Sequence, residues 1–329
     1  MGMADTVTKE YIRSNEVFAD AFNYLIYDGE QVVKPALLQE LDTTEIAIPF
    51  ALDEKENPAE DVVQKYRDVL KSAVIMQDAE ASYILLGVEN QTEIHYAMPV
   101  RNIIYDALQY GKQVSEVAKR HKSKGDRKGH NKGEYLSGFY KEDRIRPVIT
   151  LVVHFGADEW DGPLSLYDMM DLKNERLLEY VQNYRIFLID PYKLTKDDLK
   201  KFSSSLGDVL GYIKYSKDKK ALSKFLNDNQ VMIMDNDAAR VIRDVTNTPI
   251  FVPDGKGEID MCKAVRDMID ESKQEGKAEG KAEGMAVGEL NKAKKMALKM
   301  YKKGDSIEEI AEMAEFSVDQ VKEWINSAV

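Results

Sequence analysis

Residues 82–91 read SYILLGVENQ, a run of apolar residues that ends in a glutamate and two amides. A continuous apolar run of this length predicts a β-strand that is buried on both faces of a sheet. Residues 66–76, YRDVLKSAVIM, are rich in β-formers toward their end, and residues 77–81 have the composition of a turn. We therefore expect a hairpin, and we expect it to form the centre of a sheet.

Further strands and helices flank this hairpin along the chain. Apolar runs at residues 147–155 and 184–189 predict two more buried strands. Residues 16–27 and 98–114 carry apolar side chains at helical spacing, and residues 194–244 are mostly helical by the same criterion. Strands that alternate with helices predict an α/β domain.

A chain of 329 residues is long for one compact core, so we expect either one large domain with an appendage or two domains. We place the α/β domain at residues 1–250 and a helical connector at residues 251–303. Within the connector glycine recurs every four residues, at positions 276, 280, 284 and 288, amid helix-favouring alanine, glutamate and lysine. Residues 304–329 form a helical hairpin by pattern, and Ser306 with Glu309 make a capping-box pair at its start.

The composition excludes several classes of protein. The net charge of −12 argues against a protein that coats nucleic acid indiscriminately, although it permits a local basic site. Cys262 is the one cysteine, which excludes a disulfide framework or a cysteine-rich zinc site and fits a reducing compartment. We find no secretory signal at the start and no apolar stretch near about 18 residues, so we expect a soluble cytoplasmic protein that does not span a membrane.

The strongest candidate for chemistry lies at one end of the predicted hairpin. Asp68 lies near the start of the first strand, and Glu89 and Gln91 lie at the end of the second. If the strands pair, Asp68 meets Glu89 on one face of the sheet. Two converging carboxylates make a hard oxygen site that suits Mg²⁺. The alternative from spacing alone is a pair of exposed acids at strand ends.

Several short motifs, in this order along the chain, resemble the Rpn family of recombination-promoting nucleases, also called putative transposases. They are RDVL at 67–70 and GVENQ at 87–91, followed by Met98, Arg101 and Tyr105. NEVFADAF at 15–22, VVHFG at 152–156 with Trp160, and FLID at 187–190 resemble further parts of the same family. The resemblance covers roughly residues 15–245. It implies the PD-(D/E)XK fold, a restriction-endonuclease-like core with a mixed central sheet flanked by helices, here with a C-terminal helical extension.

The resemblance implies Mg²⁺- or Mn²⁺-dependent endonucleolytic cleavage of DNA, linked to recombination, mobile elements or defence. Asp68 and Glu89 would bind the metal, and Gln91 would orient the attacking water. Gln91 stands where the superfamily often has lysine, and this departure is the best argument for the alternative, a catalytically degenerate nuclease fold that binds DNA, regulates or oligomerises. Glu16 or Asp20 could add an acidic ligand, and Asp190 aligns with a family acid.

Residues 119–146 form a basic segment, with ten basic and four acidic residues inside an acidic chain. Glycines at 125, 129 and 133 predict a loop in its first half, and the charge favours contact with DNA phosphates over a merely solvated insertion. Arg101 and Tyr105 lie four residues apart on one helix face, where they either reach the phosphate or form a packing pair. The candidate phosphate contacts are Arg101, Tyr105, Lys119, Arg120, Lys122, Lys124, Arg127 and Lys128.

The C-terminal residues have the apolar rhythm of a helix-turn-helix, with Ile307 and Ile310 in one helix and Val318 and Val321 in the next. The exposed positions of these helices are mostly acidic, whereas a helix that reads DNA is normally basic. We therefore expect these helices to mediate self-association or docking, which would make the protein a homo-oligomer.

Overall fold

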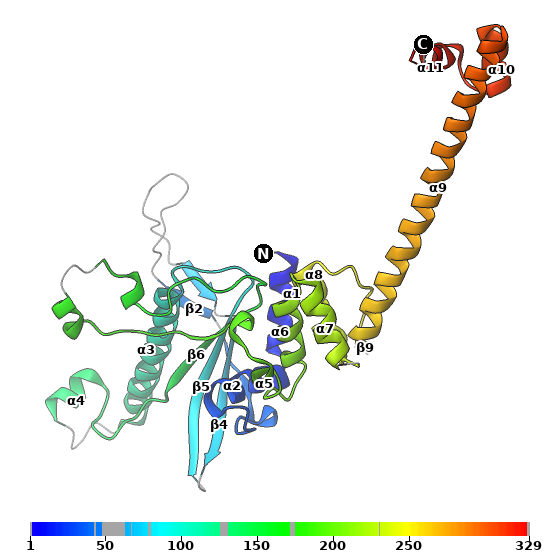
Figure 1. Cartoon of the computed structure of the whole chain (residues 1–329). Helices are drawn as coiled ribbons and strands as arrows, with labels where there is room; N and C mark the ends of the chain where they lie inside the picture. The colour runs from blue at the N-terminus through cyan, green and yellow to red at the C-terminus, as the bar shows by residue number, and fades with distance from the viewer. Residues whose placement is uncertain are drawn as a thin grey trace. The chain divides into compact units, whose positions relative to one another are not determined.

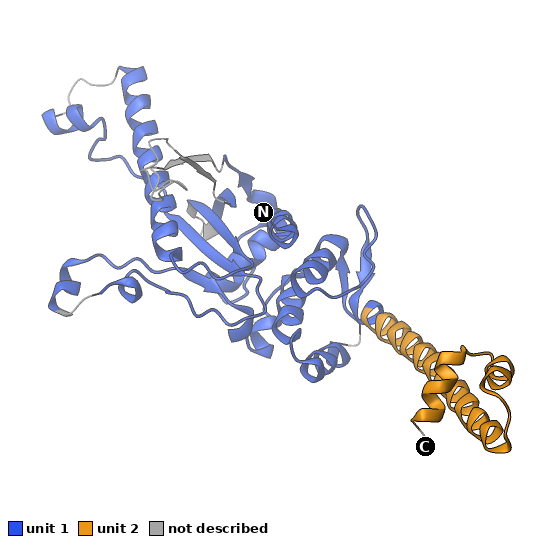
Figure 2. Ribbon diagram, turned by 90° about the horizontal axis from the view of Figure 1, so that it is seen from above, with its two compact units in different colours: residues 1–264 blue, residues 265–329 orange. Residues whose placement is uncertain are grey.

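The computed structural model describes residues 2–42, 44–47, 63–66, 68–77, 80–125, 131–171, 175–229 and 231–327. The chain divides into two compact units, Met1–Ala264 and Val265–Val329 (Figure 2). Among the described residues, no helix is both long enough and apolar enough to cross a membrane.

A five-stranded mixed sheet forms the centre of the first unit (Figure 1). Its strands lie in the order β1 (Gln39–Glu40), β4 (Val69–Gln77), β5 (Glu80–Gln91), β6 (Val148–His154) and β7 (Phe187–Ile189). β4 and β5 pair in antiparallel fashion, which confirms the predicted hairpin, and β5–β6 and β6–β7 pair in parallel. Two small antiparallel pairs lie apart from this sheet: β2 (Thr44–Ala47) with β3 (Val63–Tyr66), and β8 (Ile233–Asp235) with β9 (Glu258–Asp260).

Helices cover both faces of the sheet. On one face, α3 (Met98–Lys124) is tied to β6, because Thr150 Oγ1 donates to Asp106 Oδ1 over 2.5 Å. On the other face lie α1 (Met3–Arg13) and α2 (Asn15–Tyr27). There Asn90 Nδ2 donates to Thr8 Oγ1 over 2.6 Å, and the buried Lys71 donates to the carbonyl of Arg13. A mixed sheet with helices on both faces is the restriction-endonuclease-like arrangement that the sequence predicts.

The rest of the first unit is mostly helical, as the pattern over residues 194–244 predicts. It contains α5 (Lys196–Leu199), α6 (Leu206–Tyr215), α7 (Lys219–Asn229) and α8 (Asn236–Thr246), and α8 packs against both α1 and α6. The described residues also form the short 3₁₀ helices η1 (Pro35–Leu37), η2 (Tyr167–Met169), η3 (Glu175–Tyr180) and η4 (Pro191–Lys193). α1 itself packs against α8, α2, β4 and β5.

The predicted basic loop at 119–146 is in part helical, and the prediction of a loop there is wrong at two places. Residues up to Lys124 continue α3, which ends at Gly125 with a φ of 68°. Asn131 then caps α4 (Lys132–Ser137) through a capping box with Glu134. Helix-favouring residues before Gly125 and a good N-cap after it outweigh the glycines between them.

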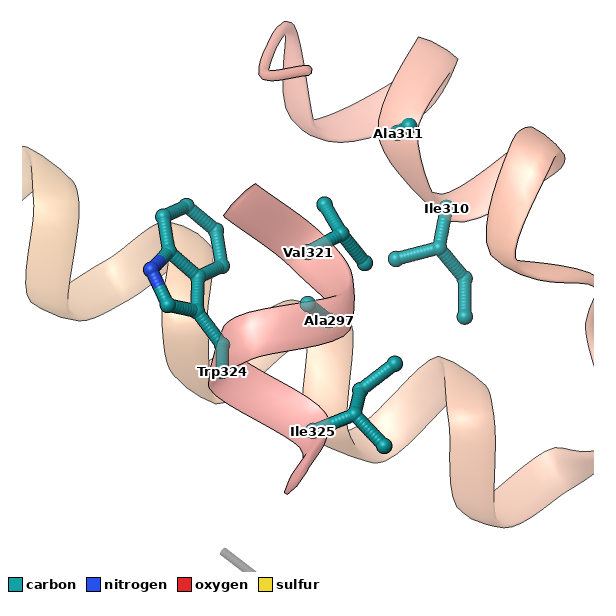
Figure 3. Packing of buried hydrophobic residues seen from close by; sticks show 6 residues of the cluster. All are labelled: Ala297, Ile310, Ala311, Val321, Trp324 and Ile325. Atoms are coloured by element: carbon teal, nitrogen blue, oxygen red, sulfur yellow. The ribbon is translucent and has the colours of Figure 1, made fainter. Parts of the chain in front are cut away.

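The second unit is a small cluster of helices formed by α9 (Met261–Lys303), α10 (Ile307–Ala314) and α11 (Val318–Asn326). The end of α9 contributes Ala297 to a buried apolar cluster with both short helices (Figure 3). The other members of this cluster are Ile310, Ala311, Val321, Trp324 and Ile325. The capping box of Ser306 with Glu309 is confirmed, and the glycine repeat lies within α9 as predicted. Self-association through these helices stays a prediction.

Candidate active site

The strand register brings the two predicted carboxylates together. Val69 pairs with Val88, so Asp68, the residue before β4, lies opposite Glu89 near the end of β5. Glu89 is fully buried and Asp68 is 7% exposed. The backbone N–H of Asn90 donates to Asp68 Oδ2 over 2.9 Å, which orients that carboxylate. The hairpin therefore holds both carboxylates rigidly at one end of the sheet.

Each carboxylate is paired with a cation from a different helix. Arg101 Nη2 of α3 lies 2.9 Å from Glu89 Oε2. Lys9 Nζ of α1 lies 3.2 Å from Asp68 Oδ1. The sequence predicted a role for Arg101 but not for Lys9. A weak signal was present in the sequence, because Thr8, Tyr11 and Ile12 lie at helical spacing. In the structure these three residues are the buried side of α1.

Arg101 and Tyr105 lie together on the α3 face that approaches Glu89. The guanidinium carbon of Arg101 is 5.7 Å from the centre of the Tyr105 ring, a distance typical of a cation–π contact. Burial is the largest single influence and lowers the pKa of Arg101, but the charge of Glu89, together with Tyr105 and Asp68, raises it by more, so the pKa of Arg101 is raised overall. Burial, followed by the charge of Glu89, raises the pKa of Tyr105. Arg101 therefore stays charged and Tyr105 stays a neutral hydrogen-bond donor at this site.

Gln91 lies two residues beyond Glu89 on β5 and is 9% exposed. Its side-chain Nε2 donates to the carbonyl of Asn90 over 2.8 Å. Its backbone carbonyl accepts a hydrogen bond from Phe155 N over 2.7 Å, which ties it to the end of β6. Gln91 thus contributes a fixed, uncharged side chain beside the two carboxylates.

The additional acids that the sequence suggested as ligands have other partners. Both carboxylate oxygens of Asp20 accept hydrogen bonds from the backbone of residues 203 and 204. Asp190 caps η4 by accepting from Tyr192 N and also accepts from Trp160 N. Glu16 is exposed on α2 and accepts from Ser14 Oγ, and hydrogen bonds from its own backbone and from Ser14 lower its pKa. These roles are structural.

The site fits Mg²⁺ as a two-carboxylate centre. No group of three His, Cys, Asp or Glu side chains able to hold a metal occurs among the described residues. Mg²⁺ commonly binds through one or two carboxylates and fills its remaining positions with water and substrate phosphate. Asp68 and Glu89 supply hard oxygen donors of this kind, and they are the residues that would hold the ion.

A basic cavity of about 330 Å³ opens farther along α3, on the sheet face that Asp68 and Glu89 share. Leu70 and Leu85 line this cavity. Leu70 on β4 lies two residues from Asp68, and Leu85 lies four residues from Glu89 on β5, so all four side chains lie on one face of the sheet. Its basic lining residues are Lys112, Arg120, Arg144 and Arg146, and its acidic ones are Asp42 and Glu116.

The cavity is lined by Arg120, Arg144 and Arg146 of the predicted basic segment. Of the other candidate contacts in that segment, Lys119, Lys122 and Lys124 are exposed and do not line the cavity. Arg127 and Lys128 lie outside the described residues. Nothing in the sequence singled out Lys112, because Arg144 and Arg146 come to the cavity from a later part of the chain.

The mixed sheet and its paired strand-end carboxylates define a restriction-endonuclease-like protein. The model of a family described as "Putative transposase, YhgA-like" matches residues 50–239, which is more than half of the chain. The chain belongs to this family, and the resemblance stated from its motifs is confirmed. No curated protein and no solved structure is significantly similar to it.

Proposed function

We propose that this protein is a Mg²⁺-dependent DNA endonuclease. The observation that carries the proposal is the placement of Asp68 opposite Glu89 at the end of the hairpin, beneath Arg101 and Tyr105. Such a cluster joins hard oxygen donors to a guanidinium, a combination that can hold a divalent metal and stabilise charge on a phosphodiester. The family description supports a role in DNA rearrangement.

In the proposed reaction, a water oxygen adds to the scissile phosphorus, and one P–O ester bond breaks. The bonding electron pair stays on the leaving oxygen, which takes up a proton, so the products are a phosphate monoester and an alcohol. A bound Mg²⁺ or Mn²⁺ would activate the water and neutralise phosphate charge. Gln91 would accept or donate a hydrogen bond to orient the water.

Arg101 would stabilise negative charge on the phosphate. Its side chain is 27% exposed although it pairs with the buried Glu89. A guanidinium has several N–H donors in one plane and can bind a carboxylate and a phosphate together.

DNA is the substrate that the basic cavity favours. Lys112 and Arg120 lie roughly 16 and 28 Å along the α3 axis from Arg101, and both line the cavity. These distances fall within about one turn of a duplex, roughly 34 Å. The net charge of −12 repels DNA from the rest of the surface, which would confine binding to this face.

The test is cleavage of supercoiled plasmid in Mg²⁺ or Mn²⁺ by the wild-type protein, Glu89→Gln and Asp68→Asn. We expect nicking by the wild type and a loss of about 100-fold or more in each variant. Glu93→Gln is the matched control, because Glu93 is exposed and lies beyond the strand end. Cleavage by all four proteins would place the active site elsewhere, and cleavage by none would favour a degenerate nuclease fold that binds DNA without turnover.

A further inference from the structure

Lys9 supplies the site with a positive charge that the β5 strand lacks. Its ammonium lies 3.2 Å from Asp68 Oδ1, and its side chain is 23% exposed, so solvent and substrate can reach it. Position 91, on the strand itself, carries the uncharged Gln91. Lys9 lies outside the range 50–239 that the family model matches.

The two oxygens of Asp68 have different partners. Oδ2 accepts the backbone N–H of Asn90, whereas Oδ1 faces Lys9. Oδ2 already accepts the Asn90 N–H, so Oδ1 is the oxygen that a divalent cation can approach without crowding that hydrogen bond. A cation bound at Oδ1 and the Lys9 ammonium would repel each other, so the two compete for this oxygen.

The backbone of α1 is held close to the site, so Lys9 cannot move far when it loses Asp68. Thr8 Oγ1 accepts a hydrogen bond from Asn90 Nδ2, and Tyr11 and Ile12 are buried on the same helix. A lysine side chain is flexible and ends in an ammonium with several rotatable N–H donors. Once displaced, the ammonium stays within reach of whatever else binds beside the two carboxylates.

We propose that Lys9 is a second phosphate-binding cation of this site beside Arg101: it holds Asp68 Oδ1 until a divalent metal takes that oxygen, and then donates to the scissile phosphate. This inference rests on the proposed function. Arg101 is less suited to the same exchange, because Glu89 is fully buried and needs its guanidinium nearby. The helix that precedes the family-matched region thus completes the site.

The test compares Mn²⁺ affinity and plasmid cleavage in the full-length protein, with Mn²⁺ binding followed by electron paramagnetic resonance. In Lys9→Met we expect Mn²⁺ to bind about two- to fivefold more tightly, because a competing surface ion pair is removed. We expect cleavage to fall by about 100-fold, because the positive charge that would stabilise the transition state is lost. Lys9→Arg should keep the wild-type affinity and part of the activity.

Arg13→Met is the matched control, since Arg13 lies one turn farther along α1 and pairs with Glu40. This variant should change neither the Mn²⁺ affinity nor the rate of plasmid cleavage. Lys9→Met combined with Gln91→Lys should recover part of the lost cleavage, because the charge returns from the neighbouring strand.

Two outcomes would overturn the inference. Unchanged Mn²⁺ affinity in Lys9→Met would exclude competition for Asp68 Oδ1, and wild-type cleavage by Lys9→Met would exclude the phosphate role. A wild-type protein that binds Mn²⁺ but cleaves no DNA would overturn the proposed function and the phosphate role together. The affinity comparison would still decide the competition, so the two failures are distinguishable.

Discussion

Glu89 Oε2 lies 2.9 Å from Arg101 Nη2, and the Glu89 side chain is fully buried. A carboxylate withdrawn from water is costly unless a cation or hydrogen-bond donors compensate it. Arg101 therefore stabilises the folded protein as well as serving the proposed chemistry. The same pair links α3 to the end of β5, so stability and site geometry depend on one contact.

Replacing Arg101 by methionine should destabilise the protein by about 3 kcal/mol, because the buried Glu89 loses its counter-charge. Urea unfolding followed by circular dichroism measures this loss. Arg101→Met combined with Glu89→Gln should cost less than the sum of the single changes, since the unpaired charge is gone. An additive loss in the double variant would mean that the two side chains do not depend on each other.

Removing charge from the basic cavity should weaken DNA binding in a salt-dependent way. For Arg120→Gln and for Arg144→Gln, we expect the slope of log affinity against log salt concentration to fall by about 0.9 each. Fluorescence anisotropy with a labelled duplex measures the slope. Lys200→Gln is the control, because Lys200 pairs with Asp197 on α5, away from the cavity. Equal slopes in all four proteins would remove the cavity from the DNA interface.

The charged form of Asp198 should stabilise the first unit at pH values above about 4. Hydrogen bonds from the Thr195 side chain and backbone, followed by Lys201, lower the pKa of Asp198 from 3.8 to about 2. A lowered folded-state pKa means that the stabilisation is present above the unfolded value and is lost as the pH falls from about 4 to about 2. Because the Asp198 side chain is 23% exposed, solvent screens part of this effect, and we expect about 1 kcal/mol.

The measurement for Asp198 is urea unfolding of the wild type and Asp198→Asn between pH 2 and pH 6. The two stabilities should differ at pH 6 and converge near pH 2. A difference that persists unchanged at pH 2 would contradict the assignment to the carboxylate charge.

Glu315→Gly should stabilise the second unit. Glu315 ends α10 in the left-handed conformation, with a φ of 60°, which strains a residue with a Cβ. Glycine avoids that strain, so we expect a gain of about 1 kcal/mol. Slower amide hydrogen exchange in α10 and α11 of the full chain would report it. Glu312→Gly, within the same helix, should accelerate exchange instead, and slower exchange in both variants would contradict the explanation.

The chain's local patterns were enough to predict the central hairpin, the two parallel strands, most of the helices and part of the site, but not α1, α4 or the full length of α3. The apolar run that ends at Glu89 and the β-formers after Asp68 specify the hairpin, because periodicity and turn composition act within a few residues. Antiparallel pairing then places Asp68 near Glu89 with little further information. Arg101 and Tyr105 followed from helical spacing in the same way.

Only the tertiary structure decided which distant groups meet at the site. Lys9 reaches Asp68 because α1 packs on β4, β5 and α8. Contacts between such distant segments cannot be predicted from the spacing of residues along the chain. Asp20 looked like a ligand, yet it binds the backbone of residues 203 and 204, far along the chain. Local sequence determines secondary structure through short-range sterics and periodic burial, whereas the partners of charged side chains depend on long-range packing of the whole core.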